Sequence, residues 1–243
     1  MSTTENYAGR DNLHAMRAAP RYNNAILCHI LDNIYGGRVL DFGAGDGLFA
    51  ELIAWHGIAP VCVEPDLAMS ALLKAKGFTA HASLDSISKR FEAIYSINVL
   101  EHIANDAETL FRLVNLAAPL GRLVLFVPAW PILYSSMDCK VGHVRRYRKS
   151  DLLAKLEGAG WAVQDVRYFD SLGFVSAFAY RFFGSSTGEL SDRSLAFYDK
   201  YLFPISKFFD LLLSGFVGKN LLVTAQRRGD ECYGPNPMSG LKQ

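Results

Sequence analysis

The chain has 243 residues, of which half are apolar and a fifth are charged, and its net charge is +1. This length and composition are typical of one globular domain of generous size, and the near-neutral charge excludes a general attraction to nucleic acid or acidic membranes. The four cysteines, Cys28, Cys62, Cys139 and Cys232, form no C-x-x-C pair. We therefore expect reduced thiols in the cytoplasm, and neither a disulfide framework nor a bound metal. The polar first residues do not resemble a signal peptide, and no apolar run reaches the roughly 20 residues of a membrane span.

The first half of the chain alternates apolar runs with helical patterns. Helices are expected within residues 20–36, after the glycines near residue 47, from about 67 to 76 and from 106 to 117. Strands are expected at residues 38–42, 60–63, 78–82, 91–97 and 122–127. Such alternation predicts an open parallel α/β sheet, whose ligands lie beyond the carboxyl ends of the strands.

The second half has a looser pattern. A long loop is expected over residues 128–149, and then a helix over 150–158 with Ser150 as its cap. Strands are expected at 161–169 and 221–227, on either side of an aromatic, helical segment at 171–219. We interpret residues 1–227 as one domain and residues 228–243 as a disordered tail.

The segment Arg38–Gly47, RVLDFGAGDG, predicts a strand that ends in a glycine turn and leads into a helix. Alternate glycines let the backbone of such a turn approach a ligand closely. A dinucleotide fingerprint, G-x-G-x-x-G, would need its third glycine at position 48, where the chain has Leu48. Asp41, just before the turn, would repel a pyrophosphate but attract an ammonium or a sulfonium. The turn therefore favours a cationic ligand; a turn without any ligand is the alternative.

The spacing D-x-G-x-G-x-G, from Asp41 to Gly47, resembles motif I of the class I S-adenosylmethionine (SAM) methyltransferases that act on small molecules. The resemblance implies a Rossmann-like sheet of seven strands, the last antiparallel, with a helical insertion between strands six and seven. It also implies an enzyme that transfers a methyl group from SAM to an oxygen, nitrogen or carbon atom. The alternatives are a SAM-binding regulatory protein without activity and, disfavoured by Leu48 and Asp41, an NAD-linked oxidoreductase.

Further residues fit a cofactor with a ribose and an adenine. Glu64 ends the second predicted strand, where a carboxylate accepts hydrogen bonds from both ribose hydroxyls, in SAM and NAD alike. By resemblance, the adenine would lie near the residues after the third strand, with Asp85 as a candidate acceptor for its amine. The residues predicted to bind the cofactor are Asp41, Gly43, Ala44, Gly45, Glu64, Pro65, Ser83, Leu84, Asn98 and Val99.

The string NVLEH, Asn98–His102, follows the fourth strand and resembles the motif found at this point in small-molecule methyltransferases. By resemblance, Asn98 faces the cofactor, and Val99 and Leu100 lie beside the adenine or the transferred methyl group. Enzymes that methylate amino groups of DNA have two prolines at these two positions, so we expect no nucleic-acid substrate. His102 is either a catalytic residue or a helix-entry residue that is hydrogen bonded to the backbone.

The loop after the fifth strand is rich in ionisable residues, and its D-x-x-x-G-H-x-R-R-Y pattern resembles a subgroup of these methyltransferases. His143 is the candidate general base, able to take a proton from a hydroxyl or an amine. Arginine at 145 or 146 suits a carboxylate or a phosphate. The residues predicted to bind the acceptor are Tyr134, Asp138, Arg145, Arg146 and Tyr147. In the alternative interpretation, Asp138 and an arginine pair only to fix the loop.

The aromatic segment 171–219 has several interpretations. It can pack against the sheet, cover an apolar substrate, form a dimer face or lie on a membrane surface. We expect a small-molecule acceptor, with an apolar, lipid-linked or glycan-linked acceptor as one option, and a protein that is a monomer or a homodimer. Peripheral contact with a membrane remains open.

Overall fold

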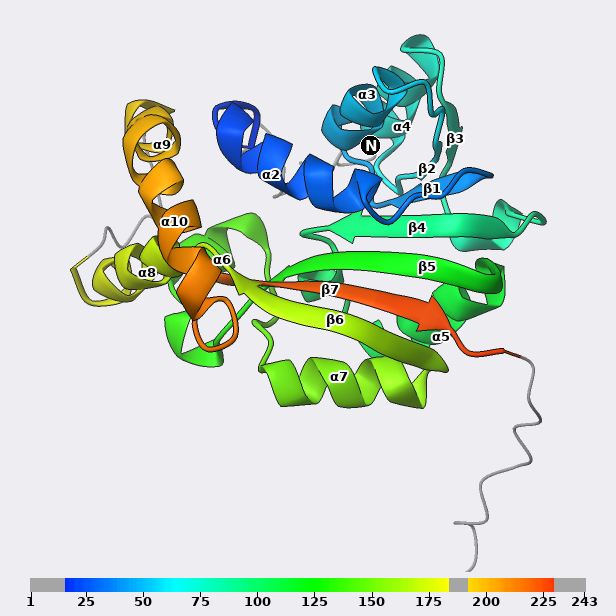
Figure 1. The fold of residues 1–243 in the computed structure, drawn as a ribbon. Coiled ribbons are helices and arrows are strands. Elements are labelled where there is room, and N and C mark those ends of the chain that lie inside the picture. Colours follow the sequence, from blue (N-terminus) through cyan, green and yellow to red (C-terminus); the bar gives the residue numbers. More distant parts are fainter. Residues whose placement is uncertain (1–15, 184–191, 230–243) are drawn as a thin grey trace, which may run out of the picture.

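The computed structural model describes residues 16–183 and 192–229. In this part of the chain, seven strands form one sheet in the order β3-β2-β1-β4-β5-β7-β6 (Figure 1). The strands are β1 Val39–Phe42, β2 Val61–Val63, β3 Thr79–His81, β4 Phe91–Ile97, β5 Ala117–Pro128, β6 Trp161–Phe169 and β7 Asn220–Arg227. Strands β1 to β5 pair in parallel, whereas β7 is antiparallel to both β5 and β6. The predicted fold, with its reversed last strand, is confirmed.

Helices cover both faces of the sheet. In Figure 1, α2 and α3 lie on one face, and α5 and α7 lie on the other. The α-helices within the described residues are α2 Pro20–Leu31, α3 Leu48–Ala54, α4 Leu67–Ala75, α5 Asp106–Leu116, α6 Ser136–Val141, α7 Lys149–Gly158, α8 Ser171–Phe183, α9 Asp192–Phe197 and α10 Phe203–Leu213.

Strand β5 shows why this arrangement forms. Successive side chains of a strand point to opposite faces. Leu123, Leu125 and Val127 belong to the apolar cluster under α5 and α7, whereas Val124 and Phe126 belong to the cluster under α2. Because both faces are buried there, the strand is apolar from Leu123 to Pro128 instead of alternating, as expected for a covered central strand.

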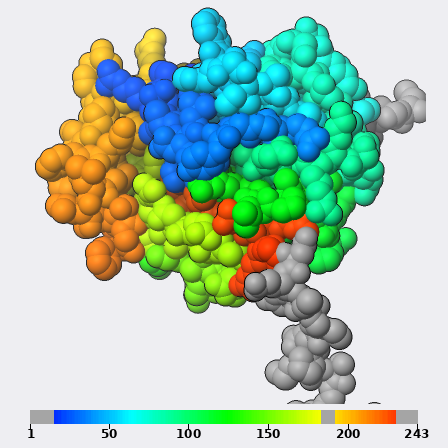
Figure 2. All heavy atoms as spheres, turned by 45° about the vertical axis from the view of Figure 1, so that its right-hand side comes forward, coloured from blue at the N-terminus to red at the C-terminus, as the bar shows by residue number. Residues whose placement is uncertain are grey.

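Two buried carboxylates fasten the helical insertion between β6 and β7, which is present as predicted. Asp199, in the π-helical turn Tyr198–Leu202, accepts hydrogen bonds from the backbone N–H groups of Arg21 (3.1 Å) and Tyr22 (2.8 Å). It thereby caps α2, which has no side-chain cap of its own. Figure 2 shows the insertion, in orange, at one end of the molecule beside α2, in blue.

The second carboxylate is Asp170, between β6 and α8, which is completely buried. Its Oδ1 accepts hydrogen bonds from the backbone of Gly173 (2.9 Å), from the Ser206 hydroxyl (2.8 Å) and from the Tyr198 hydroxyl. The ammonium of Lys219 lies 3.5 Å from Oδ2. One side chain therefore joins the start of α8, the π-helical turn, α10 and the start of β7.

Two local predictions were wrong. Helix α7 begins at Lys149, and the hydroxyl of Ser150 donates to the neighbouring Asp151 (3.0 Å) instead of capping the helix. The expected loop 128–149 contains helix α6. There the carboxylate of Asp138 accepts a hydrogen bond from the backbone of Ser135 (2.9 Å), which is one half of a capping box. This capping box was not among the features predicted from the sequence.

Strand β5 is also longer than predicted, because it follows α5 without a connecting loop and begins at Ala117. None of the helices within the described residues has the length and apolar character needed to cross a bilayer. The predicted tail, apart from Arg228 and Gly229, lies outside the described residues.

Candidate functional site

The turn after β1 is packed too tightly for any side chain at its first glycine. Gly43 has a φ of +80°, and a Cβ built on it would lie 2.3 Å from a methyl carbon of Val99. The backbone N–H groups of Gly43 and Ala44 both donate to the carbonyl of Val63 (2.9 and 3.1 Å). The turn is therefore held between the end of β2 and the segment that follows β4.

A cavity of about 450 Å³ lies at this edge of the sheet, within the size range of small-ligand sites. All ten residues predicted to bind the cofactor line it, and so does His102. Other residues that line it were not predicted from the sequence, among them Met16, Ile103, Thr109 and Arg112. Met16 comes from the chain before α2, where no periodic pattern pointed to the cavity.

Asp41 is 3% exposed, and its Oδ2 has no hydrogen-bond partner among the described residues. Burial raises the pKa of this carboxyl group to about 7; the hydroxyl of Tyr95, on the neighbouring strand, lowers it in part, and the charge of Glu64 raises it. A buried carboxylate without a partner is costly. A cation in the cavity would offset that cost.

Glu64, also 3% exposed, binds two turns at once. Its Oε2 accepts a hydrogen bond from the backbone of Gly45 (2.8 Å), and its Oε1 accepts one from the backbone of Asp66 (2.9 Å). Burial raises the pKa of the carboxyl group, and these two hydrogen bonds offset the rise in part. Each oxygen keeps a further lone pair, so the carboxylate can still accept hydroxyl groups from the cavity.

Asp85, the candidate acceptor for the adenine amine, does not line the cavity. Its exposed carboxylate pairs instead with Arg112 (2.5 Å), and it is Arg112 that lines the cavity.

Asn98 has a φ of +54°, and its backbone N–H donates to the carbonyl of Phe126 (2.8 Å). A positive φ at a residue other than glycine is uncommon and is concentrated at functional sites.

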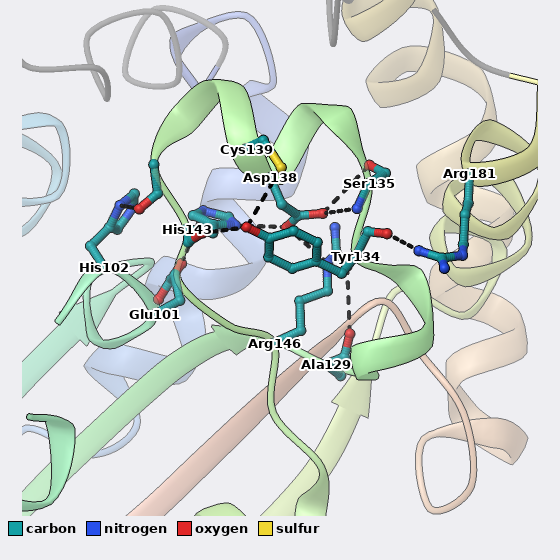
Figure 3. Close-up of polar contacts among 11 residues, drawn as sticks. Glu101, His102, Ala129, Tyr134, Ser135, Asp138, Cys139, His143, Arg146 and Arg181 are labelled. Atoms are coloured by element: carbon teal, nitrogen blue, oxygen red, sulfur yellow. Dashed lines mark hydrogen bonds and ion pairs between the residues drawn. The ribbon is translucent and has the colours of Figure 1, made fainter. Parts of the chain in front are cut away.

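The polar loop after β5 is organised around Asp138 (Figure 3). This carboxylate is 1% exposed, and its Oδ1 accepts hydrogen bonds from Nδ1 of His143 (2.7 Å) and Nε of Arg146 (2.8 Å). Burial alone would raise the pKa of Asp138, but these donors and the charge of Arg146 hold it below its usual value. The pairing of Asp138 with an arginine, the alternative interpretation of the loop, is therefore present.

The remaining residues predicted to bind the acceptor make contacts within the protein. The Tyr134 hydroxyl donates to the carbonyl of His143 (2.6 Å), and Arg145 pairs with Asp106 (2.7 Å). Tyr147 is 2% exposed, and its hydroxyl is bonded to the carbonyl of Leu100 and to Asp106. The five residues do not line the cofactor cavity. Their role in binding an acceptor remains a prediction. Tyr147 is too deeply buried to contact an acceptor in this structure.

Glu101 completes this region, although the sequence analysis gave it no role. It is fully buried, and neither carboxylate oxygen has a hydrogen-bond partner among the described residues. Burial raises the pKa of its carboxyl group to about 8. Nε2 of His143 lies 3.7 Å from Oε1, and the rings of His102 and His143 are 4.7 Å apart. The sign in the sequence was an acid that directly follows the apolar pair Val99 and Leu100 after β4.

A family model described as a methyltransferase domain matches residues 14–166, more than half of the chain. The chain belongs to this methyltransferase family. The ubiquinone biosynthesis O-methyltransferase of Schizosaccharomyces pombe is 26% identical over 162 residues, which cover 54% of this methyltransferase and 57% of that enzyme. The ubiquinone biosynthesis O-methyltransferase of Nitrobacter winogradskyi is 29% identical over 102 residues, which cover 38% of this chain and 39% of that enzyme. The matches therefore span less than two thirds of these relatives.

Solved methyltransferase structures share the fold. A SAM-dependent methyltransferase from Mesorhizobium loti has a TM-score of 0.57 at 19% identity, over 84% of this chain and 96% of the other. Magnesium protoporphyrin IX methyltransferase from Synechocystis, solved with bound SAM, has a TM-score of 0.54 at 13% identity. The match covers 94% of this chain and 87% of the other. At these identities the likeness shows the fold alone. Together with the family match, it confirms the predicted family, whose cofactor is SAM.

Proposed function

We propose that this methyltransferase transfers a methyl group from SAM to a hydroxyl oxygen of a small molecule. The observation that carries the proposal is one cavity that has the glycine turn, Asp41 and Glu64 on its wall together with His102. When bound, SAM supplies an electrophilic methyl group, which the acceptor oxygen takes in one displacement while the methyl–sulfur bond breaks and leaves its electron pair on sulfur. The choice of oxygen is supported by the names of the relatives, which are O-methyltransferases.

The residues of the cavity fit the parts of SAM. The unpaired Oδ2 of Asp41 suits its cationic methionine part, and the free lone pairs of Glu64 suit the ribose hydroxyls. Leu84 and Val99 offer apolar walls to the adenine. Because Gly43 has no side chain, the turn can lie close to the cofactor without blocking the cavity.

The acceptor side is the end of the cavity at His102. Methyl transfer needs the acceptor held in line with the methyl group, and a hydroxyl must lose its proton during the attack. His102 lies on the cavity wall, and His143 and Glu101 lie directly behind it. We place the acceptor hydroxyl at this group of side chains.

An acceptor with an apolar part suits the outer surface. The helices α8 and α10 expose large apolar side chains at the end of the sheet where β4 ends (Figure 1). These include Val175, Phe178, Phe182, Ile205, Phe208, Leu211 and Leu212. The ubiquinone pathway in the names of the relatives supports the same choice. The free thiols of Cys28, Cys62 and Cys139 support a reducing compartment such as the cytoplasm.

Two measurements test the function. Calorimetry should show binding of SAM and of its demethylated product, and far weaker binding of NAD; a protein that binds NAD and ignores SAM would contradict the proposal. Incubation with labelled SAM and a metabolite extract, followed by mass spectrometry, should then identify a labelled methyl ether. Label on nitrogen or carbon alone would exclude the oxygen acceptor.

A further inference from the structure

Two neighbouring side chains and a third from a distant part of the sequence meet behind the cofactor cavity. Glu101 and His102 follow β4, and His143 follows α6 (Figure 3). One carboxylate oxygen and one nitrogen of each ring lie within 4.8 Å of one another. Two imidazoles and a carboxylate form a donor set that is common in catalytic zinc sites.

The tautomer of His143 follows from its partner. Its Nδ1 lies 2.7 Å from a carboxylate oxygen of Asp138, which also accepts a hydrogen bond from Arg146. A carboxylate that already accepts a donor in this way can only accept, so Nδ1 carries the hydrogen. The lone pair of Nε2 is therefore free, and this buried atom has no hydrogen-bond partner among the described residues.

The same argument fixes His102. Its Nδ1 lies 3.2 Å from the carbonyl oxygen of Gly142, which cannot donate. Nδ1 again carries the hydrogen, and Nε2 keeps its lone pair. A histidine that donates from one nitrogen to a carboxylate or a carbonyl is held in the orientation and tautomer of a metal ligand. Both histidines have this second contact.

Glu101 adds a buried carboxyl group beside these lone pairs. It is fully buried, and both of its oxygens lack a hydrogen-bond partner among the described residues. Its Oε1 lies 3.7 Å from Nε2 of His143, too far for a hydrogen bond. The cation nearby, Arg146, is engaged by Asp138 and the carbonyl of Ala129. Among the described residues, no hydrogen bond therefore joins the three side chains of the cluster.

A metal ion between the three side chains would give each of these unpaired atoms a partner. Two zinc ligands at about 2.1 Å in a tetrahedral site lie roughly 3.4 Å from each other. The 3.7 Å separation is near that value, and a separation of up to 4.8 Å would have to shorten by roughly 1.4 Å. The partly exposed His102 is the ligand that can move.

We propose that Glu101, His102 and His143 bind a divalent transition-metal ion of the zinc type, with a coordination position open to the acceptor hydroxyl. The acceptor's part of this inference rests on the proposed function. A bound ion lowers the pKa of a coordinated hydroxyl. The proton passes to water, and the oxygen then forms its bond to the methyl carbon as the methyl–sulfur bond breaks. Nε2 of His143 cannot hold a metal and also take a proton, so this ligand role replaces its predicted role as the base.

Metal binding is measured directly on the full chain. We would strip the protein with a chelator, titrate it with Zn²⁺ by calorimetry, and record the visible spectrum with Co²⁺, whose bands report ligand geometry. We expect about one equivalent of Zn²⁺. Glu101→Gln and His143→Ala should weaken its affinity at least 100-fold while SAM binding, the check on folding, stays near wild type. Mg²⁺, which prefers oxygen ligands, should bind much more weakly.

Two further variants separate positioning from unspecific binding. Asp138→Asn should weaken Zn²⁺ affinity by about 10- to 100-fold, the usual effect of removing a residue that orients a ligand. His56→Ala removes an exposed histidine outside the cluster and should change nothing. Absence of Zn²⁺ binding, or unchanged affinity in Glu101→Gln, would overturn the site.

Methyl transfer, assayed before and after metal removal, distinguishes this inference from the proposed function. Transfer to a hydroxyl that falls on chelation and returns with Zn²⁺ supports both. A protein that methylates a hydroxyl without binding metal overturns the site and leaves the function in place. If the ion binds but no hydroxyl is methylated, the proposed function is overturned and the metal site stands.

Discussion

Gly43→Ala tests whether the first turn of the cofactor cavity is set by close packing. The substitution adds a Cβ at a φ of +80°, 2.3 Å from a methyl carbon of Val99. Gly57 is a matched control, because it has a φ of +78° but no atom within 4 Å of its Cβ position. Both substitutions place an alanine in the same strained backbone conformation, but only the Cβ of Gly43→Ala clashes with a neighbouring side chain, that of Val99.

The expected magnitudes follow from these two terms. Left-handed backbone costs an alanine about 1–2 kcal/mol, which should be the whole effect of Gly57→Ala on the free energy of unfolding. Overpacking adds about 1–3 kcal/mol at Gly43, for a total of about 2–5 kcal/mol. Val99→Ala removes the obstructing methyl groups. In the double variant it should therefore abolish the overpacking cost of Gly43→Ala and leave the backbone cost unchanged.

Urea denaturation of the four variants, including the double variant Gly43→Ala/Val99→Ala, measures this coupling as a double-mutant cycle. Calorimetry with SAM should show weaker binding for Gly43→Ala, because the displaced turn or Val99 enters the cavity. Equal losses for the two glycine variants, or additive effects of Gly43→Ala and Val99→Ala, would refute the reasoning.

Three further predictions concern buried polar groups. Glu64→Ala should weaken SAM binding by about 1–3 kcal/mol, the range for a lost hydrogen bond to a charged group, and unchanged affinity in a folded variant would show that Glu64 is not the ribose acid. Asp41 has a folded-state pKa of about 7 against a usual 3.8, so the folded protein holds its proton more tightly. The free energy of unfolding should therefore fall as pH rises from about 4 to about 7, relative to Asp41→Asn, in denaturation without cofactor; parallel pH profiles would contradict this. Tyr147→Phe should lower the free energy of unfolding by about 1–3 kcal/mol through its lost hydrogen bond and leave SAM affinity unchanged. Lost turnover at unchanged stability would instead support its predicted role at the acceptor.

The cofactor side could be predicted because its residues follow one another in short segments. The glycine turn, Glu64 and NVLEH each stand at the end of a strand, and parallel strands bring those ends to one edge. The acceptor side could not be predicted in the same way. Asp138 and Glu101 are 37 positions apart, and no periodicity shows that a helix hidden in the expected loop brings His143 against Glu101.

The segment Asn98–His102 links the two sides of the site. Val99 fills the space left by Gly43, and Glu101, two residues later, meets His143. Since β4 fixes where this segment begins and the carbonyl of Glu101 accepts a hydrogen bond from the backbone of Val144 (2.9 Å), it has little freedom to shift. A displacement of Val99 must therefore also displace Glu101. The position of the cofactor turn and the geometry of the Glu101–His102–His143 group are thus set by the same five residues.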